Sequence, residues 1–202
     1  MKITKQDIEK MEKLQKVQLA TTLPGAKPVC LVGTQSVDLQ SNLAPFSSIT
    51  HLGSNPMLIG MITRPATVDR HTLQNILATE HWTLNHVHSE ILEQAHQCSA
   101  RYQVSEFEAT GLTPTFEEGV NAPFVAESRV RYGLELTETL DIKSNNTKLI
   151  VGEVIFISMD DQLRQADGGI SLMTADTLAS TALDTYFKIV DYKKLPYAKP
   201  GI

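Results

Sequence analysis

Apolar residues near the N-terminus recur at three-residue spacing, which predicts an amphipathic helix within residues 1–20. The recurring residues are Ile8, Met11, Leu14 and Val17. At the start of this segment, Thr4 followed by Asp7 resembles a capping box with aspartate in place of glutamate. We expect the apolar stripe of the helix to pack on the rest of the chain or on a partner subunit.

Beyond Pro24 the pattern becomes that of β-strands. Short apolar and β-branched runs alternate with Gly, Pro, Asn and Asp, which predicts strands connected by turns. The predicted strands are residues 29–32, 57–62, 82–87, 130–139 and 149–159. The polar residues 141–147 predict a hairpin tip between the last two strands.

Two short helices are predicted between strands. The second begins at Ser89, the expected N-cap, and ends near Cys98. The first spans residues 72–79, with an inward face formed by Leu73, Ile76 and Leu77. Residues 99–128 carry scattered glycine and proline, which predicts a long excursion over the surface, and loops of this length are usually functional.

This order of elements favours a mainly β protein with added helices. Five or more strands in succession suit an antiparallel β-barrel better than a doubly wound parallel sheet. With 202 residues, 42% apolar and 20% charged, the chain is expected to form one domain with a full core.

Charge and cysteine content narrow the function classes. A formal net charge of -5 disfavours nucleic-acid and anionic-membrane partners, because phosphate groups select basic surfaces. Cys30 and Cys98 are too far apart in the sequence for a redox dithiol of the usual spacing or a zinc knuckle. The N-terminus has no apolar core of a signal peptide, and no run of eighteen apolar residues predicts a membrane span. We therefore expect a cytoplasmic protein.

The common cofactor and catalytic motifs are missing from the sequence. It contains no G-x-G-x-x-G, no G-x-x-x-x-G-K-[ST], no G-x-S-x-G and no H-E-x-x-H. His86 and His88 could hold a metal ion, with a third ligand from His51, His96 or a carboxylate. In the competing interpretation, His81 and His88 lie in solvent and His86 is a hydrogen-bonded wall residue; this interpretation assigns no metal.

Several blocks in order make the chain resemble the flavin reductase-like family, whose members have an FMN-binding split β-barrel. The blocks are residues 28–34, 41–48, 54–58, 64–65, 70–76, 111–114, 126–128 and 149–154. The resemblance implies an antiparallel, Greek-key-like split barrel. It also implies a single domain over residues 1–202, with residues 1–20 as a helical extension and residues 24–190 as the barrel core.

The resemblance implies an FMN site built from three segments. Pro45 is expected to interrupt ladder pairing and leave the N–H groups of the next residues free for the ring. Arginine, histidine and threonine at a helix start suit the terminal phosphate. The implied cofactor-binding residues are Asn42, Ala44, Pro45, Phe46, Ser47, Ser48, Arg64, Arg70, His71, Thr72, Glu127 and Ser128. Glu127 and Ser128 have a second interpretation, as structural caps.

The family chemistry implies hydride transfer from NAD(P)H through flavin N5 to an electron acceptor that the sequence does not identify. No catalytic side chain is assigned, because the flavin carries the reaction. A single phosphate seat favours FMN over FAD. The resemblance also implies a homodimer with the flavin site at the interface.

Residues 180–186 keep Tyr186 but lack the glycine pair of many family members, and residues 121–124 lack a basic residue often found there. The alternatives are a non-catalytic FMN protein for storage or sensing, the histidine-ligated metal enzyme and, with least support, an interaction module.

Overall fold

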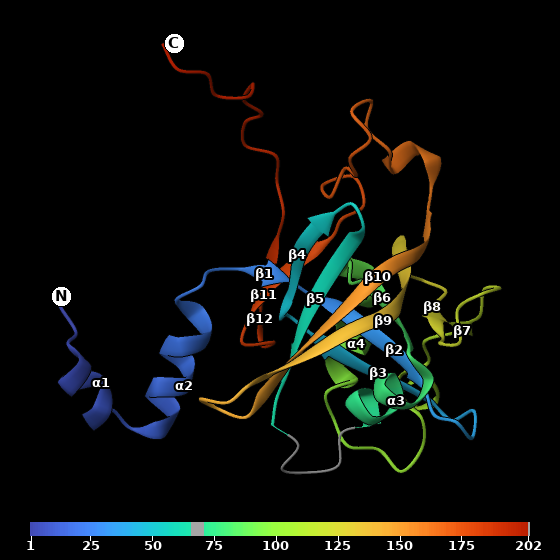
Figure 1. Ribbon diagram of the computed structural model, residues 1–202, viewed down its shortest axis with the longest axis horizontal. Coiled ribbons are helices and arrows are strands. Elements are labelled where there is room, and N and C mark those ends of the chain that lie inside the picture. The colour runs from blue at the N-terminus through green and yellow to red at the C-terminus, as the bar shows by residue number, and fades with distance from the viewer. Residues whose placement is uncertain (66–70, 202) are drawn as a thin grey trace.

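The computed structural model describes residues 1–65 and 71–201, and a seven-stranded antiparallel sheet forms its centre (Figure 1). The strands of this sheet are β2 (Cys30–Gln35), β3 (Ser41–Phe46), β4 (Ile49–Ser54), β5 (Met57–Thr63), β6 (His81–His86), β9 (Val130–Ile142) and β10 (Thr147–Met159). Their order is β3-β2-β6-β9-β10-β5-β4. The prediction of a mainly β protein with added helices is confirmed, and the predicted hairpin is β9–β10.

The sheet curls because its two outer strands are neighbours in the sequence. β3 and β4 lie at opposite ends of the strand order, yet only residues 47–48 separate them. The two ends of the sheet must therefore meet at this corner. No ladder joins β3 to β4 within the described residues, so the barrel stays split beside it.

Smaller elements surround the barrel. The helices are α1 (Lys5–Lys10), α2 (Lys13–Thr22), α3 (His71–Thr79), α4 (Leu92–Gln97) and α5 (Glu106–Thr110), with 3-10 turns η1 (Ser89–Ile91) and η2 (Asp161–Leu163). The short strands are β1 (Lys27–Pro28), β7 (Pro114–Thr115), β8 (Phe124–Val125), β11 (Leu178–Thr181) and β12 (Thr185–Lys188). None of the described helices is long and apolar enough to cross a membrane.

The core lies on both faces of β2. Leu31 packs into one apolar cluster, with Val87, Phe107 and residues of α4. Val32 packs into a second cluster inside the barrel, around Trp82. Because neighbouring side chains of a strand point to opposite faces, a strand that is buried on both faces needs an unbroken apolar run. This explains why residues 29–32 show no alternation of polar and apolar positions.

The N-terminal helix differs from its prediction. The capping box at Thr4 forms as predicted, but the helix ends at Met11, whose backbone is extended at ψ 144°, and α2 begins afresh at Lys13. Neither helix contains a buried residue. In Figure 1 both stand to one side of the barrel, beyond the segment that leads into β1. Their apolar stripe therefore does not pack on the barrel of the same chain.

Three further predictions are wrong in detail. Leu77 is 46% exposed, although Leu73 and Ile76 are buried as expected. Ser89 does not cap the next helix with its side chain. It lies in η1, where its own N–H donates to Asp176. His88, expected in solvent, is 3% exposed.

Residues 99–128 do not form a surface excursion. This segment contains α5, β7 and β8, and Phe107, Leu112 and Phe124 are almost completely buried. The segment is also hydrogen-bonded to a barrel strand: the Val125 backbone N–H donates to the side-chain oxygen Oδ1 of Asn85 at 2.9 Å. Glycine and proline here mark tight turns inside the packed structure.

Candidate functional site

A cavity of about 540 Å³ opens where the barrel is split. The β3–β4 corner, the end of β5 and the start of α3 form one side, and the end of α4 and the β11–β12 turn form the other. The residues that line it are Ala44, Pro45, Phe46, Ser47, Ser48, Ile62, Thr63, Arg64, Thr72, Leu73, His96, Cys98, Ser99, Ala182 and Leu183. The β3–β4 corner, Arg64 and Thr72, all proposed from the sequence, thus line one space, whereas the proposed residues Glu127 and Ser128 do not.

The β3–β4 corner is fixed by pairing on both sides. Pro45 does not interrupt the register as predicted, because it pairs with Leu31 within an unbroken β2–β3 ladder. An edge strand tolerates proline, since it needs hydrogen bonds on one side only. The corner itself is tied to β5, where Ser48 Oγ donates to the Ile62 carbonyl oxygen at 2.7 Å. The β2–β3 pairing and the Ser48–Ile62 hydrogen bond together fix residues 44–48 as one wall of the cavity.

The opposite end of the cavity has the features of an anion seat. Arg64 follows β5 directly, and Thr72 lies in the first turn of α3. Free N–H groups and the helix dipole at a helix start attract anions, and arginine adds bidentate hydrogen bonds. Among the described lining residues, Arg64 is the one with a permanent charge, so a negative group would be drawn to this end.

Buried polar side chains hold this helix start in place. Asn42 does not line the cavity but lies behind it, where its Nδ2 donates to Thr72 Oγ1 at 3.1 Å and to Thr34 Oγ1 at 3.2 Å. Asn75 of α3 donates to the same Thr34 oxygen at 3.1 Å. These bonds lock α3 onto β2 and β3, and Asn42 thereby supports Thr72.

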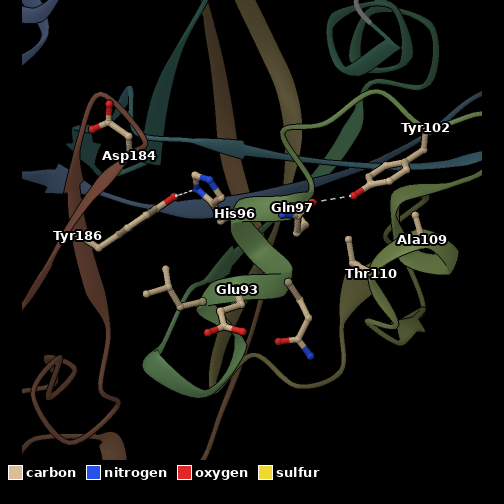
Figure 2. Close-up of a pocket in the computed structure, with 10 residues that line it drawn as sticks. Glu93, His96, Gln97, Tyr102, Ala109, Thr110, Asp184 and Tyr186 are labelled. Atoms are coloured by element: carbon tan, nitrogen blue, oxygen red, sulfur yellow. Dashed lines mark hydrogen bonds between the residues drawn. The ribbon is translucent and has the colours of Figure 1, made fainter.

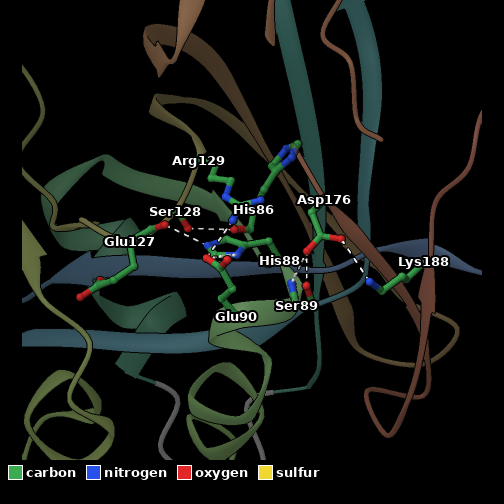
Figure 3. Close-up of polar contacts among 9 residues, drawn as sticks. All are labelled: His86, His88, Ser89, Glu90, Glu127, Ser128, Arg129, Asp176 and Lys188. Carbon is green, nitrogen blue, oxygen red and sulfur yellow. Dashed lines mark hydrogen bonds and ion pairs between the residues drawn. The ribbon is translucent and has the colours of Figure 1, made fainter. Parts of the chain in front are cut away.

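Three other described residues of the predicted set do not line the cavity. His71 is exposed at the start of α3 and does not line the cavity, and Arg70 lies outside the described residues. Glu127 accepts from the Thr113 N–H at 3.1 Å. Ser128 Oγ donates to the His86 carbonyl oxygen at 2.8 Å. Within one chain, Glu127 and Ser128 therefore belong to a separate polar cluster with His86 and His88 (Figure 3).

That cluster contains the histidines considered as metal ligands. His86 Nδ1 lies 3.1 Å from Thr177 Oγ1, and His88 Nε2 donates to the Glu127 carbonyl oxygen at 3.0 Å. In the described part of the chain, no three His, Cys, Asp or Glu side chains gather in a metal-binding arrangement. The structure thus gives both imidazoles protein partners. His86 is the wall residue of the competing interpretation, whereas His88 is buried.

Burial of His86 makes folding stability depend on pH. It lowers the pKa of this imidazole to about 4, from 6.5 for a free side chain. The unfolded chain therefore binds a proton more readily than the folded protein. The free energy of unfolding is thus unaffected by His86 above about pH 6.5 and decreases as the pH falls from 6.5 toward 4. Between about pH 8 and about pH 5 we expect His86 to cost about 2 kcal/mol of unfolding free energy.

Urea unfolding at a series of pH values checks this expectation. A His86→Asn variant should lose that part of the acid-side slope. His51→Asn, a matched change at an exposed histidine, should keep the slope of the unmodified protein. Equal slopes for His86→Asn and the unmodified protein would show that the imidazole is not held neutral by the fold.

Sequence reasoning missed the far wall of the cavity. Ser99, Ala182 and Leu183 carry no cofactor motif, and only tertiary packing brings them opposite the β3–β4 corner. Cys98 is also part of this wall, and burial raises the pKa of its thiol to about 11. The thiol is thus protonated at neutral pH and contributes an apolar surface. One indication was available: residues 180–186 lack the glycine pair of many family members.

A second cavity of about 630 Å³ adjoins the first. Its walls come from α4, α5 and β12, and His96 belongs to the lining of both cavities. Figure 2 shows His96 meeting Tyr186 on one side of α4 and Gln97 meeting Tyr102 on the other. Among the described lining residues, His96 is therefore the one that the two cavities share.

Comparison with known proteins places this geometry in a family. The family model of the flavin reductase like domain matches residues 25–179. A Shewanella frigidimarina protein, provisionally named a flavin reductase with split barrel domain, is 44% identical, with a TM-score of 0.93 over 98% of this chain and 100% of that chain. Pseudomonas fluorescens 2-nitrobenzoate 2-nitroreductase has the same fold at 21% identity, with a TM-score of 0.84 over 100% and 98% of the two chains. The FMN-binding protein of Thermus thermophilus does so at 19% identity, with a TM-score of 0.69 over 85% and 90%. The predicted split barrel is confirmed, and the chain belongs to the flavin reductase-like family.

Proposed function

We propose that this protein binds FMN in the cavity at the split of the barrel and uses it for two-electron transfer from NAD(P)H. One observation carries the proposal. The β3–β4 corner, Arg64 and the start of α3 line a single cavity together with Cys98, Ser99, Ala182 and Leu183, which are far from them in the sequence. Its volume falls within the roughly 300–1,000 Å³ typical of small-molecule sites.

The residues present fit the chemical groups of FMN. Backbone groups of the β3–β4 corner and the Phe46 side chain offer polar and apolar contacts for the ring. Arg64 and the first turn of α3 suit a terminal phosphate. A single anion seat fits FMN better than FAD, whose second nucleotide needs its own contacts. When bound, the flavin supplies the hydride-transfer chemistry, while the protein binds, orients and shields it.

Absorbance and fluorescence titration test the proposal. Purified full-length protein is expected to take up FMN, with quenching of flavin fluorescence, and riboflavin is expected to bind more weakly because it lacks the phosphate. Anaerobic addition of NADH or NADPH should then bleach the flavin bands. Lack of FMN uptake would refute the flavin site itself.

A non-catalytic FMN protein for storage or sensing is the second candidate. The observation that favours it is the departure at residues 180–186, where the glycine pair of many family members is missing. This candidate predicts FMN uptake with flavin bands that persist in the presence of both nicotinamide nucleotides. Bleaching by either nucleotide would exclude it.

We further propose a homodimer. The apolar stripe of α1 and α2 lacks cover in one chain: Leu14 is 71% and Val17 is 48% exposed. Burial of such a stripe is the usual reason for an amphipathic helix to persist. We expect sedimentation analysis to give a dimer, and a Leu14→Glu change to shift it toward monomer. The roles predicted for Glu127 and Ser128 at the flavin depend on this second copy.

A further inference from the structure

One wall of the proposed flavin cavity is a backbone turn in an unfavourable conformation. Ala182 and Leu183 line the cavity and connect β11 to β12, and their φ angles are 54° and 61°. Residues with a Cβ rarely adopt this left-handed region, which costs about 1 kcal/mol or more for each residue. Such a turn persists only where its surroundings hold it.

Tyr186 holds this turn from behind. Its Oη donates to the Leu183 carbonyl oxygen at 3.0 Å and lies 2.8 Å from His96 Nδ1. The two rings meet edge to face, with centroids 5.9 Å apart, as Figure 2 shows. Tyr186 lines the second cavity and is not among the described residues that line the flavin cavity. Any effect of its hydroxyl on the flavin must therefore pass through its two partners.

The hydrogen bonds of Tyr186 also determine which nitrogen of His96 carries the proton. Burial and the nearby Asp184 carboxylate raise the pKa of Tyr186, so its phenol keeps its single hydrogen at neutral pH. With that hydrogen directed to the Leu183 carbonyl, the phenol oxygen can only accept from His96 Nδ1–H. In the tautomer with hydrogen on Nδ1, Nε2 carries a free lone pair, and the described residues form no hydrogen bond to this atom.

We propose that Tyr186 is a positioning residue for the flavin cavity: it holds the Ala182–Leu183 turn as a wall and fixes His96 in the tautomer whose Nε2 accepts a hydrogen bond from the flavin. The inference rests on the proposed function. Flavins offer two kinds of donor to such an acceptor, the ring N3–H and the hydroxyls of the ribityl chain. His96 can meet either from the wall that it shares between the cavities.

Fluorescence titration of the full chain with FMN tests the inference. Tyr186→Phe removes one hydroxyl and is expected to weaken FMN binding by about three- to tenfold, the effect of about one hydrogen bond. Tyr102→Phe is the matched control. It removes a hydroxyl from the same second cavity, where Tyr102 donates to Gln97 Oε1 at 3.0 Å, and should leave FMN affinity unchanged.

Variants of His96 separate positioning from general damage. His96→Leu should weaken FMN binding at least as much as Tyr186→Phe, and His96→Gln, which keeps an acceptor, should recover most of the affinity. Because Tyr186 acts partly through His96, the double variant should lose less than the product of the two single losses. Retention of the His96→Leu effect with lumiflavin identifies N3–H as the donor, and its loss identifies the ribityl chain. Either result with lumiflavin supports the inference, while no effect of His96→Leu on FMN binding would overturn it.

A readout without flavin separates this inference from the proposed function. In FMN-free protein, hydrogen exchange at the amides of residues 182–185 should be faster in Tyr186→Phe than in Tyr102→Phe. Equal exchange in these two variants, or equal FMN affinity, would overturn the positioning role. If exchange is faster in Tyr186→Phe as expected, but the unmodified protein binds no FMN, the flavin site is refuted and the role of Tyr186 in holding the turn is not.

Discussion

Replacement of Arg64 by alanine is expected to weaken FMN binding by about 10- to 100-fold, the value of a charge-assisted hydrogen bond to phosphate. Arg64 lies at the end of β5 and is the one permanently charged residue among the described lining residues. Riboflavin, which shares the ring and ribityl chain but has no phosphate, should bind Arg64→Ala about as well as it binds the unmodified protein. The ratio of the two affinities therefore isolates the phosphate contact.

Two control variants sharpen this experiment. Arg101→Ala removes the same charge at an exposed position outside the cavity lining, so it corrects for the overall change in net charge. Arg64→Lys keeps the charge but loses the planar fork of the guanidinium, and an intermediate affinity is expected. If Arg64→Ala weakened FMN and riboflavin equally, the phosphate would not be held at this end of the cavity.

Introduction of a methyl group at Gly33 is expected to destabilise the fold by about 3 kcal/mol or more. A Cβ at this position would lie 2.1 Å from the Pro123 carbonyl oxygen and 2.5 Å from Thr83 Oγ1. Both atoms belong to a buried hydrogen bond, since Thr83 Oγ1 donates to that carbonyl at 2.6 Å. The added carbon must therefore displace backbone and break a bond that joins β6 to the segment before β8.

Urea unfolding of FMN-free protein at fixed concentration measures this effect. Gly53→Ala is the matched control in an outer strand, where the nearest atom to a new Cβ is 3.4 Å away, and a change within about 1 kcal/mol is expected. If Gly33→Ala and Gly53→Ala unfolded at the same urea concentration, the segment around Pro123 would be able to move away from the new Cβ at little cost in free energy. It would then contribute little to the core.

Local chemistry explains which elements could be predicted from the sequence. The capping box at Thr4 needs only residues three apart, and it forms as the spacing indicates. The β9–β10 hairpin follows from two long runs with strand-forming residues and a polar tip between them. The apolar run at residues 29–32 predicts a buried strand because no polar side chain could face solvent from either side of it. The α3 helix also follows from local spacing, although Leu77 is exposed.

The wrong predictions concern long-range contacts. Glycine and proline in residues 99–128 indicate turns correctly, but they do not tell whether the connected pieces are buried. Phe107 and Phe124 are buried because the barrel offers apolar surface there, which spacing along the chain does not reveal. Likewise, an apolar stripe at Leu14 predicts a helix that needs cover, and only the structure shows that the same chain does not supply it.

For the site, the sequence by itself determined the composition of one wall and of the anion seat. The β3–β4 corner, Arg64 and Thr72 belong to segments whose residue types already suit a flavin ring and a phosphate. Tertiary structure alone decided that they share a cavity, that Glu127 and Ser128 lie outside it in one chain, and that Tyr186 stands behind the opposite wall. The physical reason is that binding chemistry depends on residue type, which is local, whereas distance across a cavity depends on how the strands close into a barrel.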